Sequence, residues 1–386
     1  MPYIRVFGRT YLYGRKVKIP ALALLAVRDV IILPFFKKTS HCLPTREAIT
    51  EICVCKLDHL GDLLMLTPFL EAVRRGLPEA KITLVVGSWC RELAEILRRG
   101  GLIDYLVCYT PFSLNKTKAN VFVRVTKSCG ELVPALRLLR KRRFDLFVDM
   151  RPYFPCAWLL AMLSGAKLRA GFGLRGMADT FHIIVPYSMS KRLGQLYLDA
   201  LPSITGTGLT YRKPILPSMQ QHVAPANAFR LPSRYLAVQL SSRERARNID
   251  SALWEKILSS LASNFSIVLL GLADDQRYPK LEGRADVLSL IGKTTVTDCL
   301  AIIEGSVGVV SVDSFAAHVG LAYSRSVAVL MVKPYSQQRS YPANNSNLRL
   351  FPGRDGVEES IARFFSPRGA MTGKIRAPEE NEVKST

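Results

Sequence analysis

The chain has 386 residues, a hydrophobic content of 48% and a formal net charge of +22 at pH 7. This length and composition are enough to bury the cores of about two domains. Five histidines without ligand-like spacing argue against a zinc site. The eight cysteines show no paired spacing, which is typical of reduced thiols in a cytosolic protein.

The strong positive charge indicates an anionic partner or, alternatively, serves solubility alone. The sequence contains no recognised nucleic-acid-binding module and no pattern of interleaved aromatic and basic residues, so we expect no nucleic acid partner. The cytoplasmic membrane surface or an anionic lipid-linked glycan acceptor fits better, because basic segments are attracted to anionic lipids.

Residues 1–47 form a basic and apolar N-terminal extension. Its apolar run, residues 20–36, is divided by Arg28 and Asp29, so neither half reaches the roughly 18–20 apolar residues of a membrane-spanning helix. Lysines and arginines on both sides predict an interfacial helix that lies on an anionic membrane. An element packed on the following domain is the alternative.

A strand–turn–helix unit begins with the apolar run Ile52–Cys55 and continues through Lys56 to Asp62. The apolar residues that follow fall mostly on one helical face, and the helix is expected to end near Gly76. Asp62 therefore lies where a strand gives way to a helix, which is the edge at which open α/β sheets bind their ligands. Its alternative role is that of an ordinary helix cap or first-turn acid.

A second unit of the same kind lies about 250 residues later. Residues 307–312 have the pattern of a buried strand, Asp313 and Ser314 follow at the turn, and a helix of small residues carries His318 near its start. The N-terminus of this helix offers N–H groups to an anion such as a diphosphate. Alternatively, Asp313 is an ordinary cap and His318 is a polar residue on a half-buried helix.

Four ordered segments between about Glu51 and Met331 carry a family resemblance. They are Lys56-x-x-x-x-Gly61-Asp62, Phe144–Arg151, Ala157–Phe172 and Val312-Asp313-Ser314-x-x-x-His318. Together they resemble the heptosyltransferase family of glycosyltransferases, family nine. The resemblance implies an α/β fold of the GT-B type, in which two Rossmann-like, doubly wound domains face a central cleft.

On this basis we expect an N-terminal acceptor domain over residues 48–225, a C-terminal nucleotide-sugar donor domain over 226–365 and a disordered tail over 366–386. The apolar runs of the first domain predict strands near residues 52–56, 81–86, 105–108, 144–149 and 180–185. Those of the second domain predict strands near residues 235–240, 266–271, 287–291, 307–312 and 327–332.

The resemblance also implies roles for individual residues. Asp62 is the expected catalytic base, which takes the proton of the acceptor hydroxyl, and its place at a helix N-terminus is expected to lower its pKa. Lys56 and Arg151 are expected to hold an anionic acceptor. The donor-binding residues are expected in the second domain, at Ser241, Ser242, Arg245, Arg247, Asp275, Asp313, Ser314 and His318.

Three positions leave alternatives open. Asp275 matches a family acid that accepts from ribose hydroxyls, and the adjacent Asp274 is the alternative. Arg247 is the best match to a family lysine that contacts the diphosphate, with Arg245 as the alternative, and the arginines of this loop could instead be a solvated charge run. Phe315 stands where the family has a glycine that lets the backbone approach phosphate. This departure indicates a displaced helix start, a donor other than ADP-heptose or reduced activity.

The resemblance therefore implies an inverting glycosyltransferase with no cofactor besides its nucleotide-sugar co-substrate, and the lack of an Asp-x-Asp element favours metal-independent chemistry. The favoured reaction transfers heptose from ADP-heptose to a lipopolysaccharide-core or related surface-glycan acceptor, at the inner face of the cytoplasmic membrane. One alternative is a glycosyltransferase that uses a UDP- or GDP-sugar. Another is a catalytically weakened, membrane-associated binding protein of the same fold.

Overall fold

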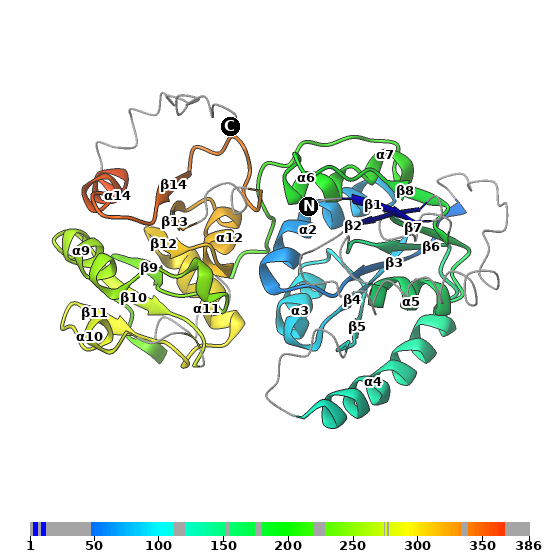
Figure 1. The fold of residues 1–386 in the computed structure, drawn as a ribbon, viewed down its shortest axis with the longest axis horizontal. Helices are drawn as coiled ribbons and strands as arrows, with labels where there is room; N and C mark the ends of the chain where they lie inside the picture. Colours follow the sequence, from blue (N-terminus) through cyan, green and yellow to red (C-terminus); the bar gives the residue numbers. More distant parts are fainter. Residues whose placement is uncertain are drawn as a thin grey trace. The chain divides into compact units, whose positions relative to one another are not determined.

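The protein divides into two compact units, each with its own parallel sheet. The computed structural model describes residues 3–6, 9–12, 48–111, 120–151, 155–173, 180–219, 228–273, 275, 278–332 and 339–366. Unit 1 comprises residues 1–221 and 335–343, and unit 2 comprises residues 222–334 and 344–386. Each unit has a six-stranded sheet with helices on both faces (Figure 1).

The sheet of unit 1 has the strand order β5-β4-β3-β6-β7-β8, and all neighbouring strands are parallel. The strands are β3 (Glu51–Lys56), β4 (Lys81–Val86), β5 (Tyr105–Cys108), β6 (Leu146–Asp149), β7 (Leu168–Phe172) and β8 (Ile183–Val185). The order reverses between β3 and β6, so the carboxyl ends of these two strands form the switch point at which open α/β sheets bind ligands. The loops that follow Lys56 and Asp149 begin at this point.

The helices of unit 1 pack on both faces of this sheet (Figure 1). They are α2 (Leu60–Gly76), α3 (Arg91–Arg99), α4 (Val121–Arg142), α5 (Pro155–Leu163), α6 (Leu193–Leu198) and α7 (Leu201–Ile204), with the short 3₁₀ helix η4 (Ser88–Cys90). On one face, Cys53 of β3 and Phe147 of β6 pack with Ala135 of α4 and Ala157 of α5. Burial of these apolar side chains provides the main driving force for this packing.

The sheet of unit 2 has the order β11-β10-β9-β12-β13-β14 and is also parallel throughout. Its strands are β9 (Tyr235–Gln239), β10 (Ser266–Leu270), β11 (Val287–Ser289), β12 (Gly308–Val312), β13 (Ser326–Met331) and β14 (Leu348–Pro352). Its helices are η7 (Arg245–Arg247), α9 (Ser251–Ala262), α10 (Pro279–Glu282), α11 (Val296–Gly305), α12 (Phe315–Ala322) and α14 (Glu358–Phe365). The switch point lies between β9 and β12.

The small residues of α12 let this helix lie close to the sheet. A Cβ atom added at Gly320 would come within 2.7 Å of the Val309 side chain and 2.8 Å of the Val327 side chain. These separations are too short for non-bonded carbon atoms, so a larger residue would push the helix away from β12 and β13. The position of the α12 N-terminus at the switch point depends on this close packing.

All ten predicted strands are confirmed within a few residues, although β8 and β11 are shorter than expected. Two strands of these sheets were missed: β7, whose sequence includes an arginine and a glycine, and β14, an edge strand whose side chains are mostly outside the core. An antiparallel pair, β1 (Tyr3–Val6) and β2 (Arg9–Leu12), was also not expected. The interfacial helix predicted over residues 20–36 and the predicted disordered tail from residue 367 lie outside the described residues.

Candidate active site

The side chain of Lys56, the last residue of β3, is buried at the switch point of unit 1. Its ammonium group donates hydrogen bonds to the Met150 carbonyl (3.0 Å) and the Tyr197 hydroxyl (2.7 Å). It also forms an ion pair with Asp58 at 2.6 Å. Burial opposes the charged form, but Asp58 outweighs this effect and the pKa of Lys56 is raised. Lys56 is therefore a fixed, charged group.

Asp58 lies between two buried cations. Besides Lys56, the guanidinium group of Arg151 contacts its carboxylate, with Nε at 2.7 Å from Oδ1. Burial raises the pKa of Asp58, but the two cations outweigh it, so the net shift is downward. Both residues that we expected to hold the acceptor thus meet at Asp58, to which the sequence argument gave no role. Its position two residues after Lys56, in the same turn, is the signal that could have identified it.

The turn that carries Asp58 is fixed by the neighbouring 3₁₀ helix η4. The indole N–H of Trp89 donates a hydrogen bond to the Asp58 carbonyl at 2.8 Å, and the Cys90 thiol lies 3.6 Å from the same oxygen. The ring of His59 lies against that of Trp89, with centroids 6.1 Å apart. The turn between β3 and α2 is therefore held by its backbone as well as by its charges.

Asp62 occupies the first turn of α2, where the backbone N–H of His59 donates to its carboxylate at 3.3 Å. The expectation that the helix N-terminus lowers its pKa is wrong. Burial raises the pKa of Asp62, the charge of Asp58 raises it further, and these effects outweigh the nearby cations. A raised pKa makes the ionised carboxylate a stronger base than an exposed aspartate.

Asp149, the last residue of β6, is a third acid of this cluster that the sequence argument did not assign. It is buried, and its carboxylate accepts a hydrogen bond from the backbone N–H of Arg151 at 2.9 Å. Burial raises the pKa of Asp149 to about 8, with a further increase from the charge of Asp58. This carboxyl group is therefore largely protonated at neutral pH.

In unit 2, Arg247 joins the loop after β9 to the end of β12. Its guanidinium group contacts Asp313 at 2.9 Å and Glu244 at 2.7 Å. Asp313 is buried, whereas the Arg247 side chain is 37% exposed, so the cation has one face on the protein and another toward solvent. Arg245 is exposed, which fits the solvated alternative for that residue. The structure thus brings together two of the predicted donor-binding residues.

His318 and Ser314 belong to α12, which follows Asp313. His318 is buried, and burial lowers its pKa to about 4; Asp313 raises the pKa and Arg247 lowers it further. Its imidazole is therefore neutral at physiological pH. Ser314 is the N-cap residue of α12, and its hydroxyl lies 2.6 Å from that of Ser311. Phe315 is the first residue of the helix and is half-buried.

Gln239, a residue that sequence reasoning missed, contacts two more of the predicted donor-binding residues. The amide of Gln239, at the end of β9, donates to the Ser241 carbonyl (3.0 Å) and to the Asp275 carboxylate (3.3 Å). Asp275 also accepts from the backbone N–H of Leu272 at 2.9 Å. The backbone N–H of Ser242 donates to an Asn248 side chain at 2.7 Å. All the predicted donor-binding residues therefore lie at or beyond the carboxyl ends of β9, β10 and β12.

Within the described ranges, the His, Cys, Asp and Glu side chains form no group of three or more that could hold a metal ion. None of the described helices combines the length and the apolar character that a membrane span requires.

Two doubly wound parallel-sheet units give this chain the two-domain α/β fold of the GT-B type. The chain belongs to glycosyltransferase family 9 (heptosyltransferase), whose family model matches residues 135–347. It is 22% identical to lipopolysaccharide heptosyltransferase 3 of Escherichia coli over 280 residues, which cover 68% of this chain and 77% of that protein.

Two solved structures share the fold. A family 9 glycosyl transferase from Veillonella parvula matches 83% of this chain and 91% of its own, with a TM-score of 0.68 and 16% identity. The E. coli heptosyltransferase WaaC with ADP matches 82% of this chain and 98% of its own, with a TM-score of 0.66 and 15% identity.

Proposed function

We propose that this chain is an inverting, metal-independent glycosyltransferase that transfers heptose from ADP-heptose to a lipopolysaccharide-core or related anionic glycan acceptor. Membership of family 9 supports the reaction class, and the similarity to lipopolysaccharide heptosyltransferase 3 supports the acceptor class. The observation that carries the proposal is the partly buried carboxylate of Asp62, which has a raised pKa at the switch point of unit 1.

In this proposal, Asp62 accepts the proton of the acceptor hydroxyl while the acceptor oxygen bonds to the anomeric carbon of the sugar. A base with a raised pKa is suited to this task, because it binds the proton more strongly in the transition state. Lys56 and Arg151 are already paired with Asp58, so their contribution to the acceptor site acts through that residue. They keep Asp58 ionised, and its charge keeps Asp62 basic.

The bond that breaks joins the anomeric carbon to the diphosphate, which leaves with the electron pair. We propose that Arg247 and the N-terminus of α12, with Ser314, take up this negative charge. Neutral His318 donates a hydrogen bond to the donor, and Asp275 accepts from the ribose hydroxyls. Attack on the face opposite the leaving group inverts the configuration of the sugar.

The test of the base is Asp62→Asn, assayed with ADP-heptose and a lipopolysaccharide-core acceptor. We expect turnover to fall by about 10²–10⁴-fold, which is the usual contribution of a general base. Donor affinity, measured by calorimetry with ADP, stays within about twofold of the wild type because the substitution lies in unit 1. Near-normal turnover would show that another group takes the proton.

Addition of a chelator leaves the wild-type rate unchanged if the reaction needs no metal.

The nucleotide of the donor is tested separately, because Phe315 at the start of α12 bears on it. We expect ADP to raise the melting temperature more than UDP or GDP. Arg247→Ala weakens ADP binding about tenfold or more through loss of a charge-assisted contact, whereas Arg245→Ala, its exposed neighbour, leaves affinity unchanged. Preference for UDP or GDP would favour the alternative donors. Binding without turnover would favour a catalytically weakened binding protein.

We also propose a peripheral location on the inner face of the cytoplasmic membrane. An acceptor attached to lipid presents its sugars at that surface, and the net charge of +22 favours contact with anionic lipids.

A further inference from the structure

Helix α4 of unit 1 carries apolar side chains on two different faces. One face packs into the core through Ala135 and Leu139, which are buried. Other apolar side chains of α4 are exposed: Val123 and Leu138 lie elsewhere on the helix, and four share one side, which we call the α4 stripe: Phe122, Val125, Cys129 and Val133. Their spacing of three, four and four residues keeps them within about 80° of the helix circumference.

The α4 stripe is unusually accessible for apolar residues. Phe122 is 74% exposed, Val133 50% and Val125 39%. Scattered exposed apolar residues are ordinary, but a periodic row on one helix face indicates a surface that another apolar phase covers.

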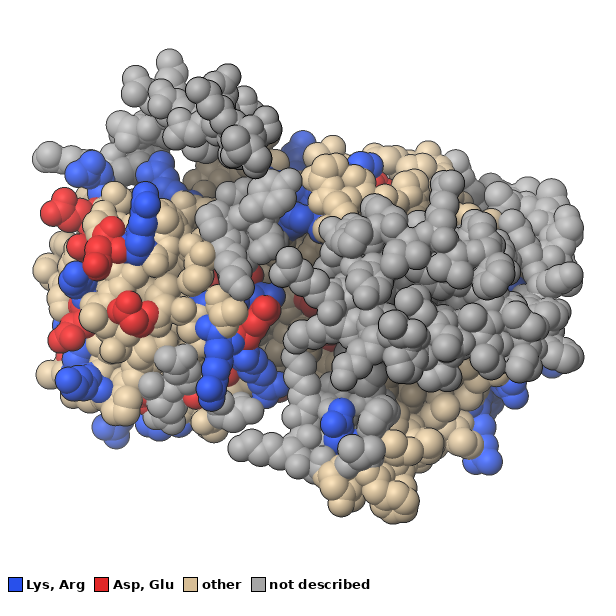
Figure 2. Space-filling view, viewed as in Figure 1, with Lys and Arg blue, Asp and Glu red and all other residues tan. Residues whose placement is uncertain are grey.

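The charges on the same helix are almost entirely positive. Lys127, Arg137 and Lys141 are exposed, and none of them forms an ion pair with a described residue. The acid of this helix, Glu131, accepts hydrogen bonds from the backbone N–H of Thr110 and the hydroxyl of Ser88, so its charge is turned toward the protein. Figure 2, viewed as Figure 1, shows the projecting end of α4 as mostly uncharged surface with Lys and Arg to either side.

We propose that the α4 stripe and the cations around it dock this chain on an anionic phospholipid bilayer. An exposed apolar row with lysines and arginines beside it is the pattern of a helix that lies in a membrane interface, with its apolar side chains below the anionic headgroups. An acidic protein surface would explain the cations but not the exposed Phe122. The inference rests on the peripheral location proposed above and assigns it to specific residues.

The experiment is flotation of the full chain with vesicles of phosphatidylcholine mixed with phosphatidylglycerol, and with vesicles of phosphatidylcholine alone. We expect the wild type to float with the anionic vesicles only. The double variant Phe122→Ser/Val133→Ser lowers the bound fraction about tenfold or more. Arg137→Glu/Lys141→Glu also lowers the bound fraction, and added salt should lower the bound fraction of the wild type in the same way.

Two matched controls show whether α4 is responsible. Leu209→Ser removes an exposed apolar residue of unit 1 outside α4, and Arg99→Glu reverses an exposed charge on α3; both are expected to leave flotation unchanged. Flotation of the α4 variants at the wild-type level would overturn the inference and move the contact to another segment, such as residues 1–47. A dimer in sedimentation velocity that Phe122→Ser/Val133→Ser dissociates, without vesicle binding, would overturn it in favour of self-association.

The outcome is separable from that of the catalytic proposal. Transfer to a soluble, delipidated acceptor does not need the membrane, so the α4 variants should retain the wild-type rate in that assay. Loss of flotation with normal soluble turnover supports docking through α4 whatever the identity of the base. A normal rate for Asp62→Asn would refute the base and leave the membrane contact standing.

Discussion

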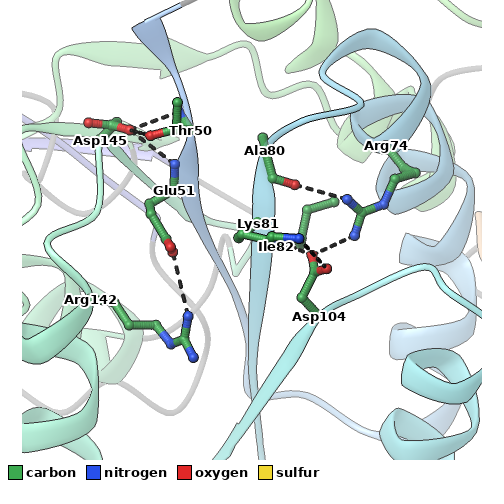
Figure 3. Close-up of polar contacts among 9 residues, drawn as sticks. All are labelled: Thr50, Glu51, Arg74, Ala80, Lys81, Ile82, Asp104, Arg142 and Asp145. Carbon is green, nitrogen blue, oxygen red and sulfur yellow. Dashed lines mark hydrogen bonds and ion pairs between the residues drawn. The ribbon is translucent and has the colours of Figure 1, made fainter.

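Acidic and basic side chains gather at both edges of the unit 1 sheet, but the pKa values of the acids shift differently. They are lowered at the amino edge, whereas two of three are raised at the carboxyl edge. At the amino edge, where the strands begin, Asp104 accepts hydrogen bonds from Arg74 (2.6 Å) and from the backbone N–H of Ile82 (2.8 Å) (Figure 3). Asp145 accepts from the backbone N–H groups of Thr50 (2.8 Å) and Glu51 (3.0 Å). Burial raises the pKa of each acid, but Arg74 at Asp104, Lys167 at Asp145 and the backbone donors outweigh it, so the net shift is downward.

At the carboxyl edge, three acids share two cations. Asp58 takes both Lys56 and Arg151 as ion-pair partners, whereas the pKa values of Asp62 and Asp149 are raised. Three buried or partly buried carboxylates with two positive charges would leave one negative charge uncompensated in a low-dielectric region. Binding a proton is the least costly solution, which is why one carboxyl group stays protonated at neutral pH.

This difference separates structural acids from acids available for chemistry. The amino-edge acids fix the starts of neighbouring strands and have little reason to change their protonation. The raised pKa values of Asp62 and Asp149 bring their titration closer to neutral pH, as is common among groups that exchange protons with a substrate. The following substitutions test the acids and cations of the two edges.

The largest expected effect is the loss of a cation, tested by Lys56→Met against Lys167→Met. Both lysines pair with an aspartate, at 2.6 Å and 2.8 Å, but the Lys56 side chain is 1% exposed and that of Lys167 is 73% exposed. Lys56→Met leaves Arg151 as the remaining ion-pair partner of Asp58 and adds one uncompensated negative charge to the cluster, so it should lower the free energy of unfolding by about 3–5 kcal/mol. Lys167→Met should lower it by less than about 1 kcal/mol. Urea unfolding measures both, and equal losses would contradict the distinction between the edges.

The second effect is the loss of an amino-edge acid in Asp145→Asn. The substitution weakens charge-assisted hydrogen bonds to two backbone N–H groups, so we expect a loss of about 1–3 kcal/mol at pH 7. Because the folded-state pKa is lowered, this stability is present above the unfolded-state value of 3.8 and disappears as the pH falls through the folded-state pKa. The difference from the wild type should therefore shrink toward acid pH. Asp355→Asn, at an exposed pair with Lys256, is the control and should have no measurable effect.

The sequence was sufficient to predict the sheets and the edges at which the polar residues gather. Apolar runs such as Lys81–Val86 have the strand bounds that the pattern predicts, and the parallel arrangement brings Lys56 and Arg151 to one switch point. The charge balance could not be predicted in this way. It depends on Asp58 and Asp149, which lie 91 positions apart in the sequence and meet only in the folded sheet.

The sign of the Asp62 shift shows the same limit. The positive end of the helix dipole favours the ionised form of Asp62, whereas burial and the charge of Asp58 favour its protonated form and prevail. In unit 2, the pairing of Arg247 with Asp313 follows from the adjacency of β9 and β12, which the sequence pattern alone does not fix. The contact of Gln239 with Asp275 likewise follows from the adjacency of β9 and β10.

The last expected effect is a change in the slope of stability with pH, tested by Asp149→Asn. The folded protein keeps the Asp149 proton up to about pH 8, whereas the unfolded chain releases it near pH 3.8. Between these values the folded state binds more protons, so this group makes wild-type stability fall as the pH rises, by up to about 1.4 kcal/mol per pH unit. Asparagine does not titrate, so the variant should become more stable relative to the wild type from pH 5 to pH 8. Unfolding by urea at several pH values measures this difference, and parallel curves would mean that Asp149 is ionised in the folded state and that the two edges treat their acids alike.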